Sequence, residues 1–413
     1  MTAYILEWIN LLGRWVHMIT GVAWIGASFY FIWLDNSLET PRSAEDSSKG
    51  VAGEVWSVHG GGMYHAQKYK LAPATMPEHL HWFKWEAYTT WISGMFMMVI
   101  MYWYGAEIYL IDPGVAALSK PVAIAIGIAV IAVGWFAYNW LCESEVGKKE
   151  NTMAAILFVV LSVIAFVLCQ VFSGRGAYMH FGAMLGTIMV GNVFFVIIPG
   201  QKDLVRAKEE GRDPNPVHGI RGKQRSVHNT YFTLPVLFVM ISNHYAMTYG
   251  HKYNWLILIA LTLIGALVRI YYVARHKGRA SLVPVFLALA VLAGIVTLIA
   301  PRESDRLSSM EAGTVQIATV QKIVNQRCSS CHANSPTQAG FATPPKGVVF
   351  ETAEDIIRQA QTIHQQTVVT KAMPIGNLTG ITNEERTAID AWFGQINKQI
   401  KINKSKININ KLR

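Results

Sequence analysis

The residues with the clearest chemistry lie near the C-terminus, in the run Cys328-Ser329-Ser330-Cys331-His332. Two cysteines separated by two residues and followed by a histidine form the attachment signature of a c-type haem. The thiols of Cys328 and Cys331 can add across the two vinyl groups of one porphyrin, and His332 can then bind the iron. The alternatives are a redox dithiol or half of a zinc site, but a zinc ribbon requires a second Cys or His pair downstream, and no further cysteine follows. The motif therefore predicts a covalent haem c.

A sixth iron ligand is expected in such a site, and in cytochromes c it is a methionine. Met373 supplies it within residues 371–377, where Pro374 and Gly376 stiffen the loop that would hold the sulfur. His332 and Met373 are thus the predicted iron ligands. The C-terminal region is predicted to carry electrons.

The composition indicates a membrane protein with more than one domain. The 413 residues are 52% hydrophobic and only 15% charged, with 13 Trp. The net charge of +10 could suggest nucleic acid, but residues 398–413 hold six Lys or Arg and no acid, so without them the charge is +4. The two cysteines outside the haem motif, Cys142 and Cys169, stand alone in apolar segments and are expected to be small buried hydrophobes. No disulfide is implied.

Eight apolar stretches are long enough to cross a bilayer, for which about twenty residues are needed. They predict an all-α fold, an eight-helix transmembrane bundle over residues 1–300. The first stretch has neither a positive charge before it nor a small-residue cleavage site, so we expect an anchor and no removable signal peptide. The stretches are 8–34, 86–105, 121–141, 153–172, 178–198, 228–248, 254–274 and 281–300.

The charges of the connecting loops predict the orientation of the bundle. With the N-terminus outside, the inside loops carry seventeen Lys and Arg residues and the outside loops three. Eight crossings then return the chain to the outside at Pro301. In a bacterial inner membrane this side is the periplasm, where c-type haem is attached, so loop charge and haem chemistry predict the same topology.

The region after the bundle reads as a linker, a small domain and a tail. Residues 301–313 are polar, and residues 314–397 have the helix order of a class I cytochrome c. Its helices are expected from Thr314 into the haem motif, near 352–366, and from Asn383 to Asn397. The low-complexity basic tail 398–413 is expected to be disordered or to lie against an anionic surface.

Ionisable residues within the predicted helices are functional candidates because burying them in a bilayer is costly. Arg14, His17, His180 and His244 all fall in the predicted periplasmic half of the bundle. Histidines that face one another from different helices can hold a second, non-covalent haem b. Alternatively, each imidazole hydrogen-bonds across helices or lies at the interface, and no spacing rule specifies a pairing.

A second cluster lies on the predicted cytoplasmic side. Three successive glycines allow backbone amides to approach a ligand, aromatic rings offer flat surfaces, and His and Arg can bind an anion or move protons. The competing interpretation is a flexible glycine turn between interfacial aromatics, with basic residues that only set orientation. The cluster comprises residues 56–65 (with Trp56, His59, Gly61 and His65), residues 79–86, and Arg221, Arg225, His228 and Asn229, with Arg269 toward the same side.

The whole chain up to about residue 397 resembles the bacterial membrane-bound urate oxidase family, also called urate hydroxylase. The resemblance rests on the bundle followed by a cytochrome c domain and on short motifs along the bundle. These motifs are residues 14–17, 24–31, 59–65, 80–86, 191–201 and 228–235.

The resemblance implies oxidation of urate to 5-hydroxyisourate, with electrons passed to haem c and on to a respiratory acceptor such as a terminal oxidase or a soluble cytochrome. Urate is a flat purine anion, suited to aromatic faces and cationic donors. We expect its site in the cytoplasmic cluster, because purine catabolism is cytosolic. The predicted catalytic residues are His59, His65 and His228, and the predicted substrate-binding residues are Arg225, Trp56 and Gly61.

Three other functions are consistent with the residues alone. A quinol-oxidising subunit would use the same haem and ignore urate. A transporter or scaffold with a redox-sensing cytochrome would show no substrate-driven haem reduction. A porphyrin-pathway oxidase is suggested by the histidine of the first helix followed by Trp and Gly, but the C-terminal cytochrome makes it less attractive.

Overall fold

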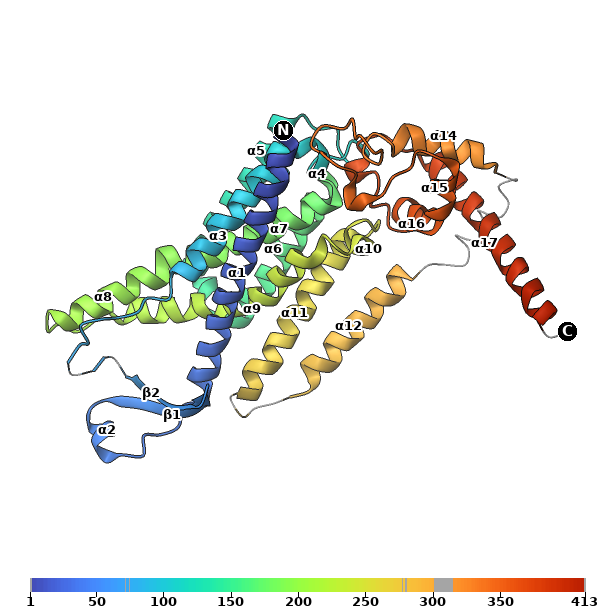
Figure 1. Cartoon of the computed structure of the whole chain (residues 1–413). Helices are drawn as coiled ribbons and strands as arrows, with labels where there is room; N and C mark the ends of the chain where they lie inside the picture. Colours follow the sequence, from blue (N-terminus) through green and yellow to red (C-terminus); the bar gives the residue numbers. More distant parts are fainter. Residues whose placement is uncertain are drawn as a thin grey trace.

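The computed structural model describes residues 2–70, 72–73, 75–276, 278, 281–300 and 315–411. The predicted linker 301–313 lies outside the described residues. Two helical parts result: a bundle, residues 2–300, and a C-terminal unit, residues 315–411 (Figure 1).

The bundle is built from long helices that lie side by side. Each of the eight predicted stretches is largely helical, although two of them contain π-helical turns, η1 and η3. The elements are α1 (Thr2–Ser37), α3 (Trp85–Met97), η1 (Met98–Tyr104), α4 (Ala106–Tyr109), α5 (Lys120–Glu143), α6 (Glu150–Val171), α7 (Gly174–Gly191), η3 (Asn192–Ile197), α8 (Ile198–Glu209), α9 (Pro216–Ser242), α10 (Ala246–Tyr249), α11 (Asn254–His276) and α12 (Val283–Ile299).

Among the described residues, five helices are long and apolar enough to cross a membrane: α1, α5, α6, the continuous α7–η3–α8, and α11. Three predicted crossings are not among these five. Stretch 281–300 is α12, a shorter apolar helix, and stretch 86–105 is divided between α3 and η1. Stretch 228–248 lies in α9, which begins with a polar and basic segment before its apolar half. The number eight stays a prediction.

Helix α7 lies at the centre of the bundle. In the most apolar window of α7–η3–α8, 61% of the residues are buried, against 6% for α1 at the periphery. Small residues allow its neighbours to approach closely. A Cβ on Gly182 would lie 2.4 Å from Val239 of α9, and one on Gly134 of α5 would lie 2.5 Å from Met184.

The prediction of an all-α fold is wrong for one segment. After the short helix α2 (Ala44–Ser48), strands β1 (Val51–His59) and β2 (Gly62–Tyr69) form an antiparallel hairpin. The turn between them is Gly60-Gly61, whose φ values of +56° and +81° are those that a two-residue hairpin turn requires. Glycine adopts such angles without steric cost, so two of the three glycines form a regular hairpin turn, where the competing interpretation was a flexible one, and Gly62 begins β2.

The C-terminal unit contains the helices expected from the sequence, some of them divided. Its elements are α14 (Ile317–Arg327), η4 (Pro345–Gly347), α15 (Ala353–Arg358), α16 (Ala360–His364), η5 (Gln365–Val369), η6 (Ile375–Asn377) and α17 (Asn383–Lys411). They enclose a small apolar core that includes Val320, Ile356 and Trp392. The tail was expected to be disordered or to lie on a surface, but α17 continues as a helix to Lys411.

The two parts meet at one end of the bundle. The C-terminal unit lies beside α4 and α10, at the end where the N-terminus also lies, whereas the hairpin and α8 lie at the opposite end (Figure 1). This is the arrangement that the predicted topology requires of the N-terminus and the C-terminal unit.

Candidate functional site

A buried arginine forms the centre of the most polar region inside the bundle. The Arg225 side chain, on α9, is only 1% exposed. Its guanidinium donates to Asn139 Oδ1 at 2.8 Å and to Asn192 Oδ1 at 3.4 Å, and it lies over the ring of Tyr138, 5.1 Å from the centroid. Its Nε has no partner, and no salt bridge joins it to an acid among the described residues. A buried cation without a counter-ion is costly, so this arrangement favours an anionic ligand.

His228 lies three residues further along α9 and so on nearly the same face of the helix as Arg225. Its Nδ1 lies 2.8 Å from the Tyr138 hydroxyl and 3.8 Å from the Cys142 sulfur, and both of these residues belong to α5. Cys142 is buried, as predicted, and all four cysteines of the chain are free. The imidazole, phenol and guanidinium are thus brought to one place.

Asn192 supports the Tyr138 hydroxyl beside His228. Its amide donates to the Tyr138 oxygen at 3.1 Å and to Asn229 Oδ1 at 2.8 Å, and the Asn229 amide donates to the carbonyl of Met189 at 3.0 Å. While it accepts from Asn192, the phenol can donate its own proton to a His228 Nδ1 that carries none. The pair can therefore pass a proton from the phenol to the imidazole.

The π-helical turn η3 begins at Asn192, and such turns often occur at functional sites. Flat aromatic surfaces surround the cluster. Trp135 is stacked with Phe195, with centroids 5.5 Å apart, and Phe232 meets the edge of Tyr138. We call Arg225, His228, Tyr138, Asn139, Asn192 and Asn229 the buried polar cluster.

The other predicted urate-site residues belong to the hairpin. Trp56 and His65 face each other across the strands and are stacked, with centroids 4.2 Å apart. His65 Nε2 lies 2.8 Å from the carboxylate of Glu54, which is buried in the hairpin and was not predicted. The hydrogen bond from the backbone N–H of Arg42, together with the one to His65, holds the pKa of Glu54 below its usual range.

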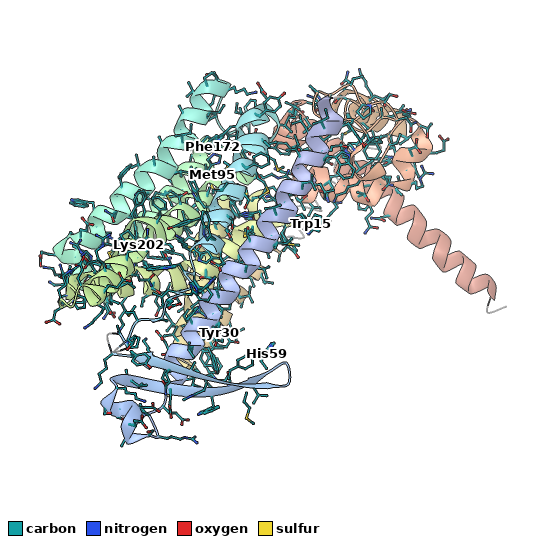
Figure 2. The ribbon with its side chains drawn as sticks, turned by 60° about the vertical axis from the view of Figure 1, so that its left-hand side comes forward. Trp15, Tyr30, His59, Met95, Phe172 and Lys202 are labelled. Carbon is teal, nitrogen blue, oxygen red and sulfur yellow. The ribbon has the colours of Figure 1, made fainter. Side chains whose placement is uncertain are left out.

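His59 is exposed at the end of β1, and Gly61 forms the turn, far from the bundle core (Figure 2). Among the described residues no hydrogen bond or ring contact joins the hairpin to α9. The structure therefore brings Arg225 and His228 together, and separately Trp56 and His65. Arg269, on α11, is buried elsewhere, with its guanidinium 4.5 Å from the centroid of Phe29.

The three histidines predicted for a haem b lie apart from one another. His180 is fully buried, with Nδ1 2.9 Å from the Gly176 carbonyl and Nε2 accepting from the indole of Trp103 at 3.2 Å. His17 Nδ1 bonds the Thr90 carbonyl at 3.0 Å. His244 is exposed. These contacts match the interhelical interpretation, and the haem b stays a prediction.

The haem motif and the predicted sixth ligand come together in one narrow crevice of the C-terminal unit. Cys331, His332 and Met373 line it, with Cys328 beside them, and Ile108 of the bundle closes one side. His332 Nδ1 bonds the Val348 carbonyl at 3.0 Å, which orients the ring so that Nε2 is the nitrogen left for a metal. The donor set fits a covalent haem.

No cluster of three or more His, Cys, Asp or Glu side chains could hold a metal ion in the part of the chain that the structure describes. The zinc alternative therefore has no set of ligands there. A single histidine and a methionine, as in the crevice, are instead the axial ligands of a haem iron.

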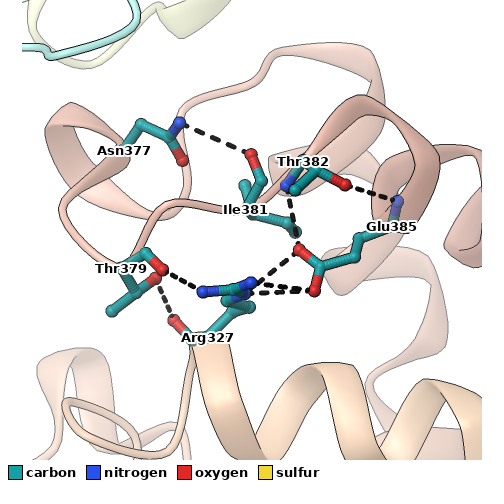
Figure 3. Close-up of polar contacts among 6 residues, drawn as sticks. All are labelled: Arg327, Asn377, Thr379, Ile381, Thr382 and Glu385. Carbon is teal, nitrogen blue, oxygen red and sulfur yellow. Dashed lines mark hydrogen bonds and ion pairs between the residues drawn. The ribbon is translucent and has the colours of Figure 1, made fainter.

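The residue before the motif is anchored by a network that the sequence did not reveal (Figure 3). Arg327 makes a bidentate salt bridge to Glu385, with Nε to Oε2 at 3.0 Å, and also donates to the Thr379 carbonyl. The Thr379 hydroxyl donates to the carbonyl of Arg327 at 2.8 Å, and Glu385 accepts from the Thr382 N–H. The network ties the end of α14, where the cysteines begin, to the start of α17.

Comparison with known proteins identifies the family through the bundle. The family model described as urate oxidase N-terminal matches residues 3–300, which include the whole buried polar cluster. No curated protein and no solved structure matches the chain. Because the match covers most of the chain, the protein belongs to the urate oxidase N-terminal family.

Proposed function

We propose that this protein is a membrane-bound oxidase of urate, which it converts to 5-hydroxyisourate, and that the electrons pass through a haem c in the C-terminal unit to the respiratory chain. The family match supports the urate-related oxidation. The observation that carries the choice of site is Arg225, a buried guanidinium with no acidic partner among the described residues.

The buried polar cluster has the chemistry that a purine anion needs. The free Nε of Arg225 can pair with the negative charge of urate, and the amides around it can bond the carbonyl and N–H groups of the ring. Aromatic side chains nearby offer faces for a flat ligand. We assign substrate binding to Arg225, Asn192 and Asn229, and leave Trp56 and Gly61 of the hairpin outside the site.

Proton transfer is assigned to Tyr138 and His228. Urate and one water yield 5-hydroxyisourate, two protons and two electrons. Since the phenol oxygen lies 2.8 Å from His228 Nδ1, a proton that reaches this oxygen can be relayed to an imidazole whose Nδ1 carries none. His59 and His65 have no place in this relay, because the hairpin lies away from it.

The electron acceptor would be a haem held by the sulfurs of Cys328 and Cys331, with His332 and Met373 as its iron ligands. It would supply one-electron transfer, two such transfers being needed for each urate. Among the described residues, five helices long and apolar enough to cross a membrane support a membrane location. The loop charges favour a periplasmic C-terminal unit, from which a terminal oxidase or a soluble cytochrome would take the electrons.

The test is to mix the purified haem-loaded protein with urate under anaerobic conditions and to record the haem spectrum. Reduction by urate, with 5-hydroxyisourate as product, is expected. Reduction by a quinol but not by urate would identify a quinol-oxidising subunit instead, and reduction by neither would contradict both.

A further inference from the structure

The backbone of the C-terminal unit packs directly on the bundle at Gly376, the middle residue of η6. A Cβ at this position would lie 2.9 Å from the carbonyl oxygen of Ile108 and 3.0 Å from that of Ile111. The φ of Gly376 is +57°, which also favours glycine. No larger residue fits between η6 and the end of α4 as they stand.

A second close approach has the reverse arrangement. Here the glycine belongs to the bundle, at Gly250 after α10, and the approaching backbone is that of the C-terminal unit. A Cβ on Gly250 would lie 2.1 Å from the carbonyl oxygen of Thr370. The two contacts stand on either side of residues 371–375, the loop that carries Met373.

Side chains extend the junction to the crevice itself. Ile108 lines the crevice together with Cys331, His332 and Met373, and its Cδ1 lies 3.3 Å from where a Cβ on Gly340 would be. From inside the C-terminal unit, the Arg386 guanidinium donates to the Met373 carbonyl at 3.1 Å. The Met373 loop is thus held between its own domain and α4.

We infer that residues 370–376 are the docking surface by which the C-terminal unit binds the end of the bundle, and that this docking holds Met373 in place over the crevice. Gly376 is then a positioning residue for the sixth iron ligand. Ile108, the bundle residue that lines the crevice, would then lie on the path of electrons from the bundle. This last role rests on the proposed function, whereas the docking itself does not.

Hydrogen exchange of the full haem-loaded chain in detergent tests the docking. Gly376→Ala should raise exchange about tenfold or more both in residues 370–376 and across the junction in residues 105–112. Gly380→Ala is the matched control, because its φ of +66° carries the same strain but the atom nearest to its added Cβ, Arg327 Nη1, is 3.9 Å away. The control should leave residues 105–112 unchanged.

Two further measurements separate undocking from misfolding. Helix α14 should stay protected in Gly376→Ala, while the absorption band of the methionine–iron bond in the oxidised protein weakens. Gly250→Ala changes a residue of the bundle and none of the C-terminal unit. Its added Cβ would lie 2.8 Å from Ala246 O of the bundle as well as close to Thr370 O, and the variant should raise exchange in residues 370–376. If α14 loses protection in Gly376→Ala, the exchange of residues 370–376 in Gly250→Ala shows whether the junction holds this loop.

Unchanged exchange across the junction in both variants would overturn the inference, as would an equal rise in residues 105–112 with Gly380→Ala. None of these experiments adds urate. Docking can therefore be established even if urate fails to reduce the haem, and urate oxidation can be established even if the junction proves loose.

Discussion

The Tyr138 hydroxyl lies 2.8 Å from Nδ1 of His228, and the same phenol ring lies beneath the guanidinium of Arg225. One tyrosine of α5 thus joins a group that can accept a proton to a cation that can hold an anion. Because Arg225 and His228 come from a single turn of α9, the three groups keep their relative positions unless α5 and α9 separate. Such a fixed arrangement is suited to binding and deprotonating one substrate.

Removing the positive charge of Arg225 should weaken urate binding. Arg225→Gln keeps some hydrogen bonding but loses the charge, and we expect kcat/KM for urate-dependent haem reduction to fall about 10- to 100-fold, since hydrogen bonds to charged groups contribute roughly 1.5–3 kcal/mol. Arg221→Gln, an exposed position one turn earlier on α9, is the control and should leave the rate unchanged. Equal rates for the two variants would remove Arg225 from the site.

The proton relay should fail when either partner is replaced. Tyr138→Phe and His228→Gln should each lower kcat by about 10²-fold or more while changing KM little, because proton transfer by positioned groups contributes roughly 10²–10⁴-fold. Tyr102→Phe removes another buried hydroxyl, which donates to Asn243, and should have almost no effect. The idea fails if single-turnover reduction by urate proceeds at the normal rate in Tyr138→Phe.

The haem should depend on the motif cysteines. Cys328→Ser combined with Cys331→Ser should leave a protein whose haem is extracted completely by acidified acetone, whereas the unaltered protein keeps its haem. Met373→Leu should retain the covalent haem but lower its reduction potential, because a methionine ligand raises the potential. Redox titration measures this change, and an unaltered potential would exclude Met373 as a ligand.

Acidification should loosen the hairpin through Glu54. The pKa of Glu54 is lowered in the folded protein, so the ionised carboxylate stabilises the folded hairpin. This stabilisation is complete above the ordinary Glu pKa of about 4.3 and is lost as the pH falls through the lower pKa of the folded state. Hydrogen exchange of residues 51–69, corrected for the intrinsic rate, should accelerate over that range. Glu54→Gln should remove the pH dependence; if the acid transition persists, another group causes it.

The Arg327–Glu385 pair should stabilise the C-terminal unit. Arg327→Met leaves the half-buried Glu385 carboxylate without its partner, and we expect the free energy of unfolding of this unit to fall by about 1–3 kcal/mol. Protection of α14 in hydrogen exchange measures the change. Arg358→Met breaks a more exposed pair with Asp355 and should cost under about 1 kcal/mol.

Hydropathy was sufficient to find the long helices, because each apolar stretch is long and largely helical. It did not reveal the hairpin, although a signal was present. Gly60-Gly61 separates two stretches rich in Val, Trp, Tyr and Met, which is a typical hairpin pattern. The same three glycines also fit the approach of a backbone to a ligand, so the glycine pattern alone does not distinguish the two.

The buried polar cluster could be predicted only in part from residue spacing. Arg225 and His228 were predicted from one helix, but Tyr138 and Asn139 come from α5 and Asn192 from η3, and only packing brings these helices together. Asn229 was named in the predicted cytoplasmic cluster, whereas Asn192 was not, although it lies within a motif that carried the family resemblance and is a polar residue inside an apolar segment. The burial of Cys142 was predicted, but its position next to His228 was not.

Residues Gly174–Glu209 form one continuous helix, and the π turn that begins at Asn192 lies within it. Such a turn holds one residue more than an ordinary helical turn. Deleting Val193 should therefore convert η3 to α-helix and leave the residues beyond it facing nearly the same way, because the turn loses only the residue that it held in excess. A deletion in an ordinary α-helical turn would instead rotate Lys202 and Asp203 by about 100°, so the central helix can be shortened by one residue at η3 without changing the direction of its far end.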